Sequence, residues 1–345
     1  MADCIIRLES TTGRVRVDLL AVGATIQKLF LPDRNGTIQD VVLGCDDIEF
    51  YQRGETPYFG GIVGRVANRI GHGEFQLHGR THRVALNDHG KHCLHGGDAG
   101  FNRVAWKGRR VSDCHATFEY HSNDGEEGFP GHVDVCADYE LAVDGSSLTI
   151  TMTGIVTGAA TPLNLASHGY FNLGGHDAGP SCLLNHELEM KEARQYTPVD
   201  AEHIPTGEVR SVEKDPAMDF TIAKRIGKDI DSVPGGYDHN YVLSASTDDD
   251  RASTMRLAAV LYHADSGRGM RVYTTAPGVQ FYSGNFLEAH PPGKDGAVYT
   301  KHSGCCLETQ GFPDAVHHPH FPSIIYEPGD EYRHVVKYEF FTSEK

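Results

Sequence analysis

The stretch YELAVDGSSLTITM, at residues 139–152, indicates the class of fold. Apolar residues occupy alternate positions on both sides of the dipeptide Asp144-Gly145: Tyr139, Leu141 and Val143 come before it, and Leu148, Ile150 and Met152 come after it. Apolar residues at every second position are typical of a strand with one buried face, and Asp-Gly favours a tight turn. We therefore predict an antiparallel hairpin across these residues.

The same pattern recurs along the chain. A second hairpin is predicted at residues 255–274, around the turn Asp265-Ser266-Gly267, with further strands near 15–19 and 335–340. Helical periodicity is limited to short stretches such as 46–53, and 39 glycines with 16 prolines suit many strands joined by turns. We expect an all-β protein with few short helices, in which two large antiparallel sheets pack as a sandwich with a face able to hold a ligand.

The sequence shows no boundary between domains. A prior of about 150 residues per domain suggests two domains, but no composition shift or flexible linker interrupts the sequence. The most polar stretch, residues 246–253, is interpreted as a short acidic loop between strands. No fixed-period repeat indicates a propeller or solenoid. We therefore predict a single domain spanning residues 1–345.

The charge balance limits the partners. The chain has 31 Lys and Arg against 47 Asp and Glu, a formal net charge of −16, whereas nucleic acid is bound through dense basic patches. No run approaches 18 apolar residues, and the N-terminus has no basic segment leading into a long apolar one. We expect a cytoplasmic protein with neither nucleic-acid nor membrane partners. The sequence does not fix the oligomeric state; a monomer is our working expectation and a dimer the alternative.

Cysteine and histidine usage bears on metals. The eight cysteines include no CxxC pair and are expected to be free thiols. Cys305 and Cys306 are adjacent, so on a strand they point to opposite faces and make a poor zinc clamp. The tract His317-His318-Pro319-His320 suggests a metal by composition, but its prolines suggest an extended surface loop. With no glycine fingerprint for nicotinamide and no HExxH, we expect no metal and no cofactor.

Five segments combine small residues, turns and side chains that can move protons. They are GRVANRI (64–70), HCLHGGDAGFNRVAW (92–106), PLNLASHGYFNLGG (162–175), GGYDHNYVL (235–243) and LETQGFPDAVHHP (307–319). His168 follows small residues and precedes Gly169, which leaves the imidazole approachable on one side and suits a general acid. Glu308 could hold its loop, bind a metal with the histidines or move a proton.

The other candidates also have structural interpretations. His95 and His168 could each be a buried histidine satisfied by the backbone rather than a group beside a ligand. Asn68 and Arg69 could donate to ligand hydroxyls or a carboxylate, or Arg69 could form an ion pair on an edge strand. Asp238 could accept from hydroxyls or form the turn before the next strand.

Taken in order, these segments resemble the aldose 1-epimerase (galactose mutarotase) family. The resemblance is carried by GRVANRI, LHGG, LNLASHGYFNL, YDHN, GVQFYSGNF and LETQGFPDAVHHPHFPS, from about residue 60 to 325. It implies a galactose mutarotase-like sandwich, or supersandwich, and an isomerase of carbohydrate, galactose and hexose metabolism. The histidines after FPDAV depart from the more neutral residues expected there but leave the catalytic positions untouched.

The resemblance also implies residue roles. Glu308 would be the catalytic base and His168 the catalytic acid. Five residues, each in its own motif, would bind the sugar hydroxyls and ring oxygen: Asn68, Arg69, His95, Asp238 and Gln280. The reaction implied is interconversion of the α and β anomers of free aldohexoses such as D-galactose and D-glucose, without a cofactor.

The implied interconversion of anomers requires particular protonation states of Glu308 and His168. A base removes the proton of the C1 hydroxyl while an acid protonates the ring oxygen, and the opened aldehyde rotates and closes on its other face. Glu308 must then be ionised and His168 protonated, and each favours the other's charged form if they approach. We predict a His168 pKa at or above about 6.5, and a hexose-sized gap between the two side chains.

Three other functions remain open from the residues. A hexose-6-phosphate 1-epimerase needs extra basic side chains for the phosphate, for which Arg65, Arg69 and Arg103 are candidates, although the acidic balance favours a free sugar. A non-catalytic sugar-binding module on the same fold has no use for both Glu308 and His168. A metal-dependent sugar isomerase would use the 317–320 tract. Aromatic candidates for stacking on the sugar are Trp106, Tyr170, Phe171 and Phe286.

Overall fold

The protein is built almost entirely from antiparallel strands. The structure, a computed structural model, describes residues 5–243, 254–289 and 291–343. The two α-helices in these ranges are short, α1 (Ile48–Gln52) and α2 (Gly179–Leu184). The predicted acidic loop at 246–253 lies outside the described residues. None of the described helices has the length and hydrophobicity needed to span a bilayer.

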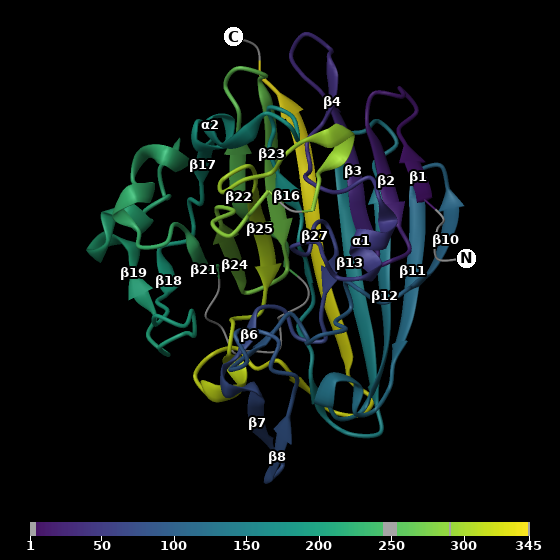
Figure 1. Cartoon of the computed structure of the whole chain (residues 1–345), viewed down its shortest axis with the longest axis vertical. Coiled ribbons are helices and arrows are strands. Elements are labelled where there is room, and N and C mark those ends of the chain that lie inside the picture. The colour runs from purple at the N-terminus through teal and green to yellow at the C-terminus, as the bar shows by residue number, and fades with distance from the viewer. Residues whose placement is uncertain (1–4, 244–253, 290, 344–345) are drawn as a thin grey trace.

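A nine-stranded sheet forms one layer. Its strands, in spatial order, are β10 (Lys107–Ser112), β11 (His115–Ser122), β12 (His132–Leu141), β13 (Ser147–Thr157), β27 (Glu331–Thr342), β23 (Arg268–Thr274), β22 (Arg256–Tyr262), β17 (Glu187–Glu189) and β20 (Lys224–Arg225). Every neighbouring pair is antiparallel. The long strands β11, β12, β13 and β27 run side by side in Figure 1.

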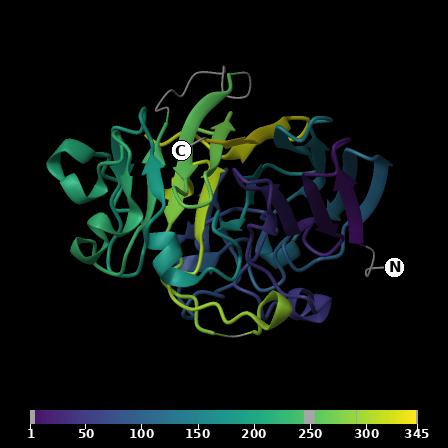
Figure 2. The ribbon, with the colours of Figure 1, turned by 90° about the horizontal axis from the view of Figure 1, so that it is seen from above.

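A six-stranded sheet forms the second layer. Its order is β16 (Tyr170–Phe171), β25 (Cys305–Gln310), β24 (Gly278–Tyr282), β21 (Asp238–Val242), β18 (Gln195–Thr197) and β19 (Arg210–Ser211). A four-stranded sheet near the N-terminus has the order β1 (Ile5–Glu9), β2 (Arg16–Leu20), β3 (Thr25–Pro32) and β4 (Ile38–Asp40). Seen from above, this purple N-terminal sheet and the green strands β18 and β19 lie at opposite sides of the molecule (Figure 2).

Four two-stranded ladders complete the fold. They pair β5 (Ile62–Val63) with β15 (Ala166–Ser167), β6 (Arg69–Ile70) with β9 (Cys93–Leu94), β7 (Glu74–Leu77) with β8 (Arg80–Arg83), and β14 (Thr161–Pro162) with β26 (Ile325–Tyr326). The first two ladders hold the motif segments around residues 64–70, 92–97 and 166–172 close to the six-stranded sheet.

The two predicted hairpins are present, with local corrections. β12 and β13 pair through Leu141 and Leu148, and Gly145 adopts φ +80°, as a tight turn requires. Val143 was predicted to lie on a strand but belongs to the turn and is 61% exposed. In the second hairpin, a register shift between Leu257 and Ala259 interrupts the predicted alternation. The predicted helical stretch contains α1, capped by the Asp47 side chain.

The main hydrophobic core lies between the two large sheets. One buried cluster includes Ile150 and Val272 of the nine-stranded sheet and Val279, Phe281 and Leu307 of the six-stranded sheet. Because alternate residues on a strand face opposite sides, the neighbours of these last three, Gln280 and Glu308 among them, point away from the core. The sandwich therefore buries one face of the six-stranded sheet and leaves a polar row on the other.

Candidate active site

Sheet register brings three candidate residues together. Glu308 on β25 lies directly opposite Gln280 on β24, and Gln280 lies directly opposite Asn240 on β21. Asp238 is two residues before Asn240 on the same strand, so both side chains point to the same face. Asp238, Gln280 and Glu308 thus share the face that turns away from the core.

His168 reaches the same face from the neighbouring strand connection. It lies between β15 and β16, and Tyr170 of β16 pairs with Cys306 of β25. His168 Nε2 is 3.5 Å from Glu308 Oε2, and both side chains are at most 4% exposed. The structure therefore brings together two residues that are 140 positions apart in the chain.

The predicted hexose-sized gap between these side chains is wrong, because only 3.5 Å separates the two polar atoms. The chemistry explains why adjacency is sufficient. The hydroxyl oxygen on C1 and the ring oxygen are both bonded to C1, so the groups that deprotonate one and protonate the other belong side by side. A sugar would therefore approach the pair from one side.

Asn68 and His95 hold each other in place. The Asn68 N–H donates to His95 Nδ1 at 3.1 Å, and the His95 N–H donates to the Asn68 carbonyl at 2.9 Å. Since Nδ1 accepts, the proton of the neutral ring lies on Nε2. Burial lowers the pKa of His95 well below its ordinary value, with the nearby His168 contributing. His95 is therefore a neutral, fixed donor beside His168, whose ring centroid is 5.0 Å away.

Arg69 is oriented by a partner that the sequence interpretation missed. Its Nε donates to Asp88 Oδ2 at 2.8 Å, and both side chains are nearly buried. The ion pair considered as a structural alternative for Arg69 therefore exists. The same guanidinium lies close enough to Glu308 to lower its pKa, so the pairing with Asp88 also aims a positive charge at the site.

Asp238 is held by Gln280 and lies beside His203. Gln280 Nε2 donates to Asp238 Oδ1 at 2.7 Å, and His203 Nδ1 lies 3.7 Å from Asp238 Oδ2. His203 comes from the connection between β18 and β19 and was not predicted from the sequence. The ring of Phe286, which is 57% exposed, stands edge-on to His203 with 5.7 Å between centroids. An exposed aromatic ring therefore borders this side of the site.

The predicted direction of the His168 pKa is wrong for the free protein. Burial lowers the pKa of His168 to about 4. Burial, together with the negative charge of Asp238, raises the pKa of Glu308 well above its ordinary value, and Arg69 opposes this. Because both groups are withdrawn from water, the neutral pair is favoured over the ion pair until something else stabilises the charges.

Aromatic and thiol groups surround the imidazole of His168. Tyr58 lies 5.6 Å from it and 4.5 Å from His95, between ring centroids, and Tyr170 lies 5.1 Å from His168. Cys306 Sγ is 3.7 Å from His168 Nδ1. Tyr58 had no signal in the sequence. Of the other stacking candidates, Trp106 and Phe171 are core residues.

Two clusters of three side chains within the described ranges have the composition of a metal site. One consists of His95, His168 and Glu308. Its His95 uses the Nδ1 lone pair for the Asn68 N–H and has its proton on Nε2, so the ring has no lone pair free for a cation. The hydrogen bonds therefore favour proton chemistry over metal ligation at this site.

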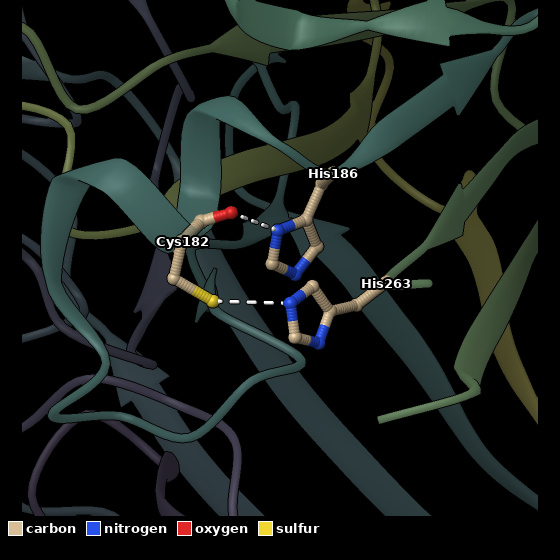
Figure 3. Close-up of side chains that lie close together, drawn as sticks. All are labelled: Cys182, His186 and His263. Carbon is tan, nitrogen blue, oxygen red and sulfur yellow. Dashed lines mark hydrogen bonds between the residues drawn. The ribbon is translucent and has the colours of Figure 1, made fainter. Parts of the chain in front are cut away.

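The second cluster, Cys182, His186 and His263, shares no residue with the first (Figure 3). His186 Nδ1 donates to the Cys182 carbonyl and His186 Nε2 accepts from the Leu173 N–H, both at 2.9 Å. Both ring nitrogens are thus in use, which leaves only Cys182 Sγ and His263 Nε2 facing each other at 3.3 Å. These contacts fasten α2 to the turn between β22 and β23.

The histidine tract has a structural role that differs from the prediction. Residues 315–317 form a 3₁₀ turn rather than an extended loop. His317 donates to Asp314 at 2.7 Å, His318 to the Pro205 carbonyl at 3.3 Å, and His320 to the Gly207 carbonyl at 2.8 Å. The tract therefore pins the neighbouring loop at residues 205–207.

Two of the three arginines considered for a phosphate, Arg65 and Arg103, donate to backbone carbonyls. Arg65 is buried and donates to the carbonyls of Pro130, Gly131 and Asn123. Arg103 donates to the carbonyls of Asp98 and Gly54. Both guanidiniums are thus held against the backbone, and the third candidate, Arg69, is paired with Asp88.

Comparison with known proteins assigns the class. Residues 5–339 match the aldose 1-epimerase family. This match covers nearly the whole chain, so the chain belongs to the aldose 1-epimerase family and is an isomerase. The predicted family and the predicted β-sandwich fold are confirmed.

Individual relatives agree with this class. The chain is 43% identical to the galactose mutarotase of Bos taurus over 98% of this chain and 95% of the bovine one. It is 44% identical to the galactose mutarotase of Homo sapiens over 94% of this chain and 91% of the human one. The crystal structure of an aldose epimerase homologue from C. elegans superimposes with a TM-score of 0.88 at 29% identity, covering 99% of this chain and all of the other.

Proposed function

We propose that this protein interconverts the α and β anomers of free aldohexoses such as D-galactose and D-glucose, with Glu308 as the base and His168 as the acid. The observation that carries the proposal is the buried contact of 3.5 Å between these two side chains. It lies beside a neutral donor, a fixed cation and a hydrogen-bonded carboxylate, which together suit a polyhydroxylated ligand.

The proposed reaction moves two protons and breaks one bond. Glu308 takes the proton of the C1 hydroxyl, His168 gives a proton to the ring oxygen, and the bond between C1 and the ring oxygen breaks to give the open-chain aldehyde. Rotation about C1–C2 presents the other face of the carbonyl. The ring oxygen then attacks C1 and returns its proton to His168, while Glu308 returns its proton to the former carbonyl oxygen.

The working protonation state must form when the sugar binds. The ion pair of Glu308 and His168 contains the same number of protons as the neutral pair, so a proton shift between two atoms 3.5 Å apart is sufficient. Arg69 favours the carboxylate electrostatically. Hydrogen bonds from the sugar hydroxyls to the carboxylate add to this, because hydrogen bonding to the charged form lowers the pKa of a carboxyl group.

The binding roles follow from the free hydrogen-bonding groups. His95 offers its Nε2–H, and Arg69 offers the guanidinium N–H groups that Asp88 does not take. Asp238 offers carboxylate oxygens to hydroxyl donors, and its position is fixed by Gln280. Asn68, whose Oδ1 accepts the Arg69 N–H, contributes the N–H groups of its side-chain amide.

The proposal also covers the domain organisation, the class of sugar and the location of the protein. We infer that residues 1–345 act as a single domain, since one hydrophobic core includes residues from Ile6 to Tyr338. A free sugar is favoured over a sugar phosphate, because Arg65 and Arg103 donate to backbone carbonyls and Arg69 is paired with Asp88. A cytoplasmic monomer is the proposed form.

Polarimetry tests the proposal. Freshly dissolved α-D-glucose and α-D-galactose should approach their equilibrium rotations faster with the protein than in buffer alone, and α-D-glucose 6-phosphate should gain much less. A faster approach with the phosphate than with either free sugar would instead identify a hexose-6-phosphate epimerase. Sugar binding by calorimetry with an unchanged rate of rotation would identify a non-catalytic binding module.

A further inference from the structure

A second group of polar side chains continues the row that contains Glu308. Thr197 on β18 pairs with Asn240 on β21, which pairs with Gln280 on β24, which pairs with Glu308 on β25. Gln310 lies two residues beyond Glu308 on β25 and so points to the same face. We call these five residues, Thr197, Asn240, Gln280, Glu308 and Gln310, the amide row.

The amide row holds an unusual share of unpaired polar atoms. Each of its side chains is at most 4% exposed. Among the described residues, 14 buried side-chain nitrogen and oxygen atoms have no hydrogen-bond partner, and seven of them belong to the amide row. The seven are Thr197 Oγ1, Asn240 Nδ2 and Oδ1, Gln280 Oε1, Glu308 Oε2, and Gln310 Nε2 and Oε1. Buried polar groups are rarely left unpaired, so this concentration points to a bound partner.

The absence of a side chain at Gly278 lets the Asn240 amide lie against the backbone of the row. Gly278 lies directly opposite Gln310 and next to Asn240 across the strand pair. A Cβ at residue 278 would meet Asn240 Oδ1 at 2.3 Å, so the Asn240 amide lies over the glycine. Val242 follows Asn240 by two residues on β21 and so shares its face, and it belongs to an apolar cluster with Ile70 and Phe312. The amide row is thus enclosed between the sugar-facing residues and an apolar cover.

The chemistry of the row identifies the kind of partner. Its unpaired atoms include amide donors, amide oxygens, a carboxylate oxygen and a hydroxyl. A ligand that both donates and accepts satisfies such a mixture, whereas an anion or a cation satisfies only part of it. Asn240 and Gln310 flank Gly278 on the side of the row where Val242 belongs to the apolar cover, and neither is proposed to contact the sugar. Water, which typically makes two to four hydrogen bonds in buried polar sites, fits both conditions.

We propose that the amide row binds ordered water molecules and that Asn240 and Gln310 are positioning residues that act through this water on Glu308 Oε2. The water donates to Oε2, so it stabilises the carboxylate form and fixes its orientation toward the sugar. This inference rests on the proposed role of Glu308 as the base. It extends the active site by three residues, Thr197, Asn240 and Gln310, that have no contact with the sugar.

The other groups around Glu308 make such support necessary. The titratable and charged groups whose interaction with Glu308 is evident are His168, His95, Asp238, Arg69, Cys306, Tyr170, Tyr282 and Tyr338. Of these, Arg69 favours the carboxylate and Asp238 opposes it. Burial is the largest influence on the pKa of Glu308 and also opposes ionisation. Hydrogen bonds to Oε2 counter it directly.

The test replaces the amides by apolar groups of similar shape. Asn240→Leu and Gln310→Met are expected to fold, because removing polar groups that lack protein partners costs little. We expect the acidic limb of the pH profile of kcat/KM to move to higher pH by about one unit, and kcat near pH 6 to fall about tenfold, with KM little changed. Asn240→Ser, which keeps a hydrogen-bonding group and adds space for water, should restore much of the loss.

Gln27→Met is the matched control. Gln27 on β3 is also a buried glutamine with an unpaired Oε1, but it lies outside the amide row. This variant should leave the acidic limb in place. Folded Asn240→Leu and Gln310→Met variants with the wild-type pH profile and kcat would overturn the inference, as would an equal shift in Gln27→Met.

A crystal structure separates this inference from the proposed function. It should show ordered water within hydrogen-bonding distance of both Glu308 Oε2 and the Asn240 amide, whether or not the protein proves to be a mutarotase. Direct amide-to-amide bonds that leave no water in the row would overturn the inference while leaving the roles of Glu308 and His168 intact. Failure of the polarimetric assay with the water in place would instead refute the proposed function.

Discussion

Glu308→Gln separates catalysis from stability at one position. The substitution keeps the shape of the side chain but removes the carboxylate that we propose as the acceptor of the C1 hydroxyl proton. We expect kcat for α-D-glucose to fall by about 10²–10⁴, the contribution of a positioned acid or base. Sugar binding should be retained within about tenfold, because His95, Arg69 and Asp238 are unchanged.

The same variant should be more stable than the wild type at neutral pH. Burial raises the pKa of Glu308, so the folded state holds this proton more tightly than the unfolded state does. Ionisation therefore costs stability as the pH rises above the unfolded value of about 4.3. Glutamine avoids this cost, and its amide can donate to His168 Nε2, 3.5 Å from the replaced oxygen. A gain of about 1–3 kcal/mol is expected, comparable to the cost of an unsatisfied buried polar group.

Two measurements check this reasoning. Polarimetry gives kcat, and urea unfolding at pH 7 and pH 4 gives the free energy of unfolding, whose difference between variant and wild type should shrink at pH 4. Glu119→Gln, on the exposed side of β11, is the control and should change neither quantity. Wild-type turnover in Glu308→Gln would refute the role as base. A loss of stability at pH 7 would refute the account of its burial.

Three further predictions follow from other contacts. Asp88→Asn should lower kcat/KM about tenfold and destabilise the protein by about 1–3 kcal/mol, because it removes the charge that orients Arg69. The control Asp113→Asn, in an exposed ion pair, should cost under about 0.5 kcal/mol of stability, and equal effects of the two variants would contradict the reasoning. Burial lowers the pKa of His334 to about 4, so stability that is present above about pH 6.5 is lost as the pH falls toward 4. In urea unfolding, His334→Gln should reduce this loss by on the order of 1–2 kcal/mol. An unchanged loss would contradict this role of His334. Activity should survive prolonged dialysis against a chelator, and a loss restored by added metal would contradict the proton mechanism.

The local pattern of the sequence predicted the strands but not their arrangement. The alternation at 139–152 and 255–274 identifies two hairpins because both depend on neighbouring residues. The placement of β27 between β13 and β23 joins segments far apart in the chain, and no short pattern encodes it. The same is true of the pairing between Tyr170 and Cys306 that brings His168 to Glu308.

The motifs identified side chains that would face the site, but not those that hold them. Asp88 has no neighbouring residue that signals its contact with Arg69. Tyr58 and His203 reach the site from backbone with positive φ, +64° and +62°, which bulky residues seldom adopt and which no sequence preference reveals. The pKa of His168 was predicted in the wrong direction because its burial depends on the packing of Tyr58 and Tyr170 around it.

Strand β25 contributes adjacent residues to the hydrophobic core and to the candidate active site. Leu307 fills the sandwich core while Glu308, the next residue, faces the site. Because side chains alternate, sliding this strand by one position would put a carboxylate into the apolar interior and a leucine in the place of the proposed base. Molecules with this strand misaligned would thus be both unstable and inactive. An insertion or deletion in β25 should therefore lower stability and activity together.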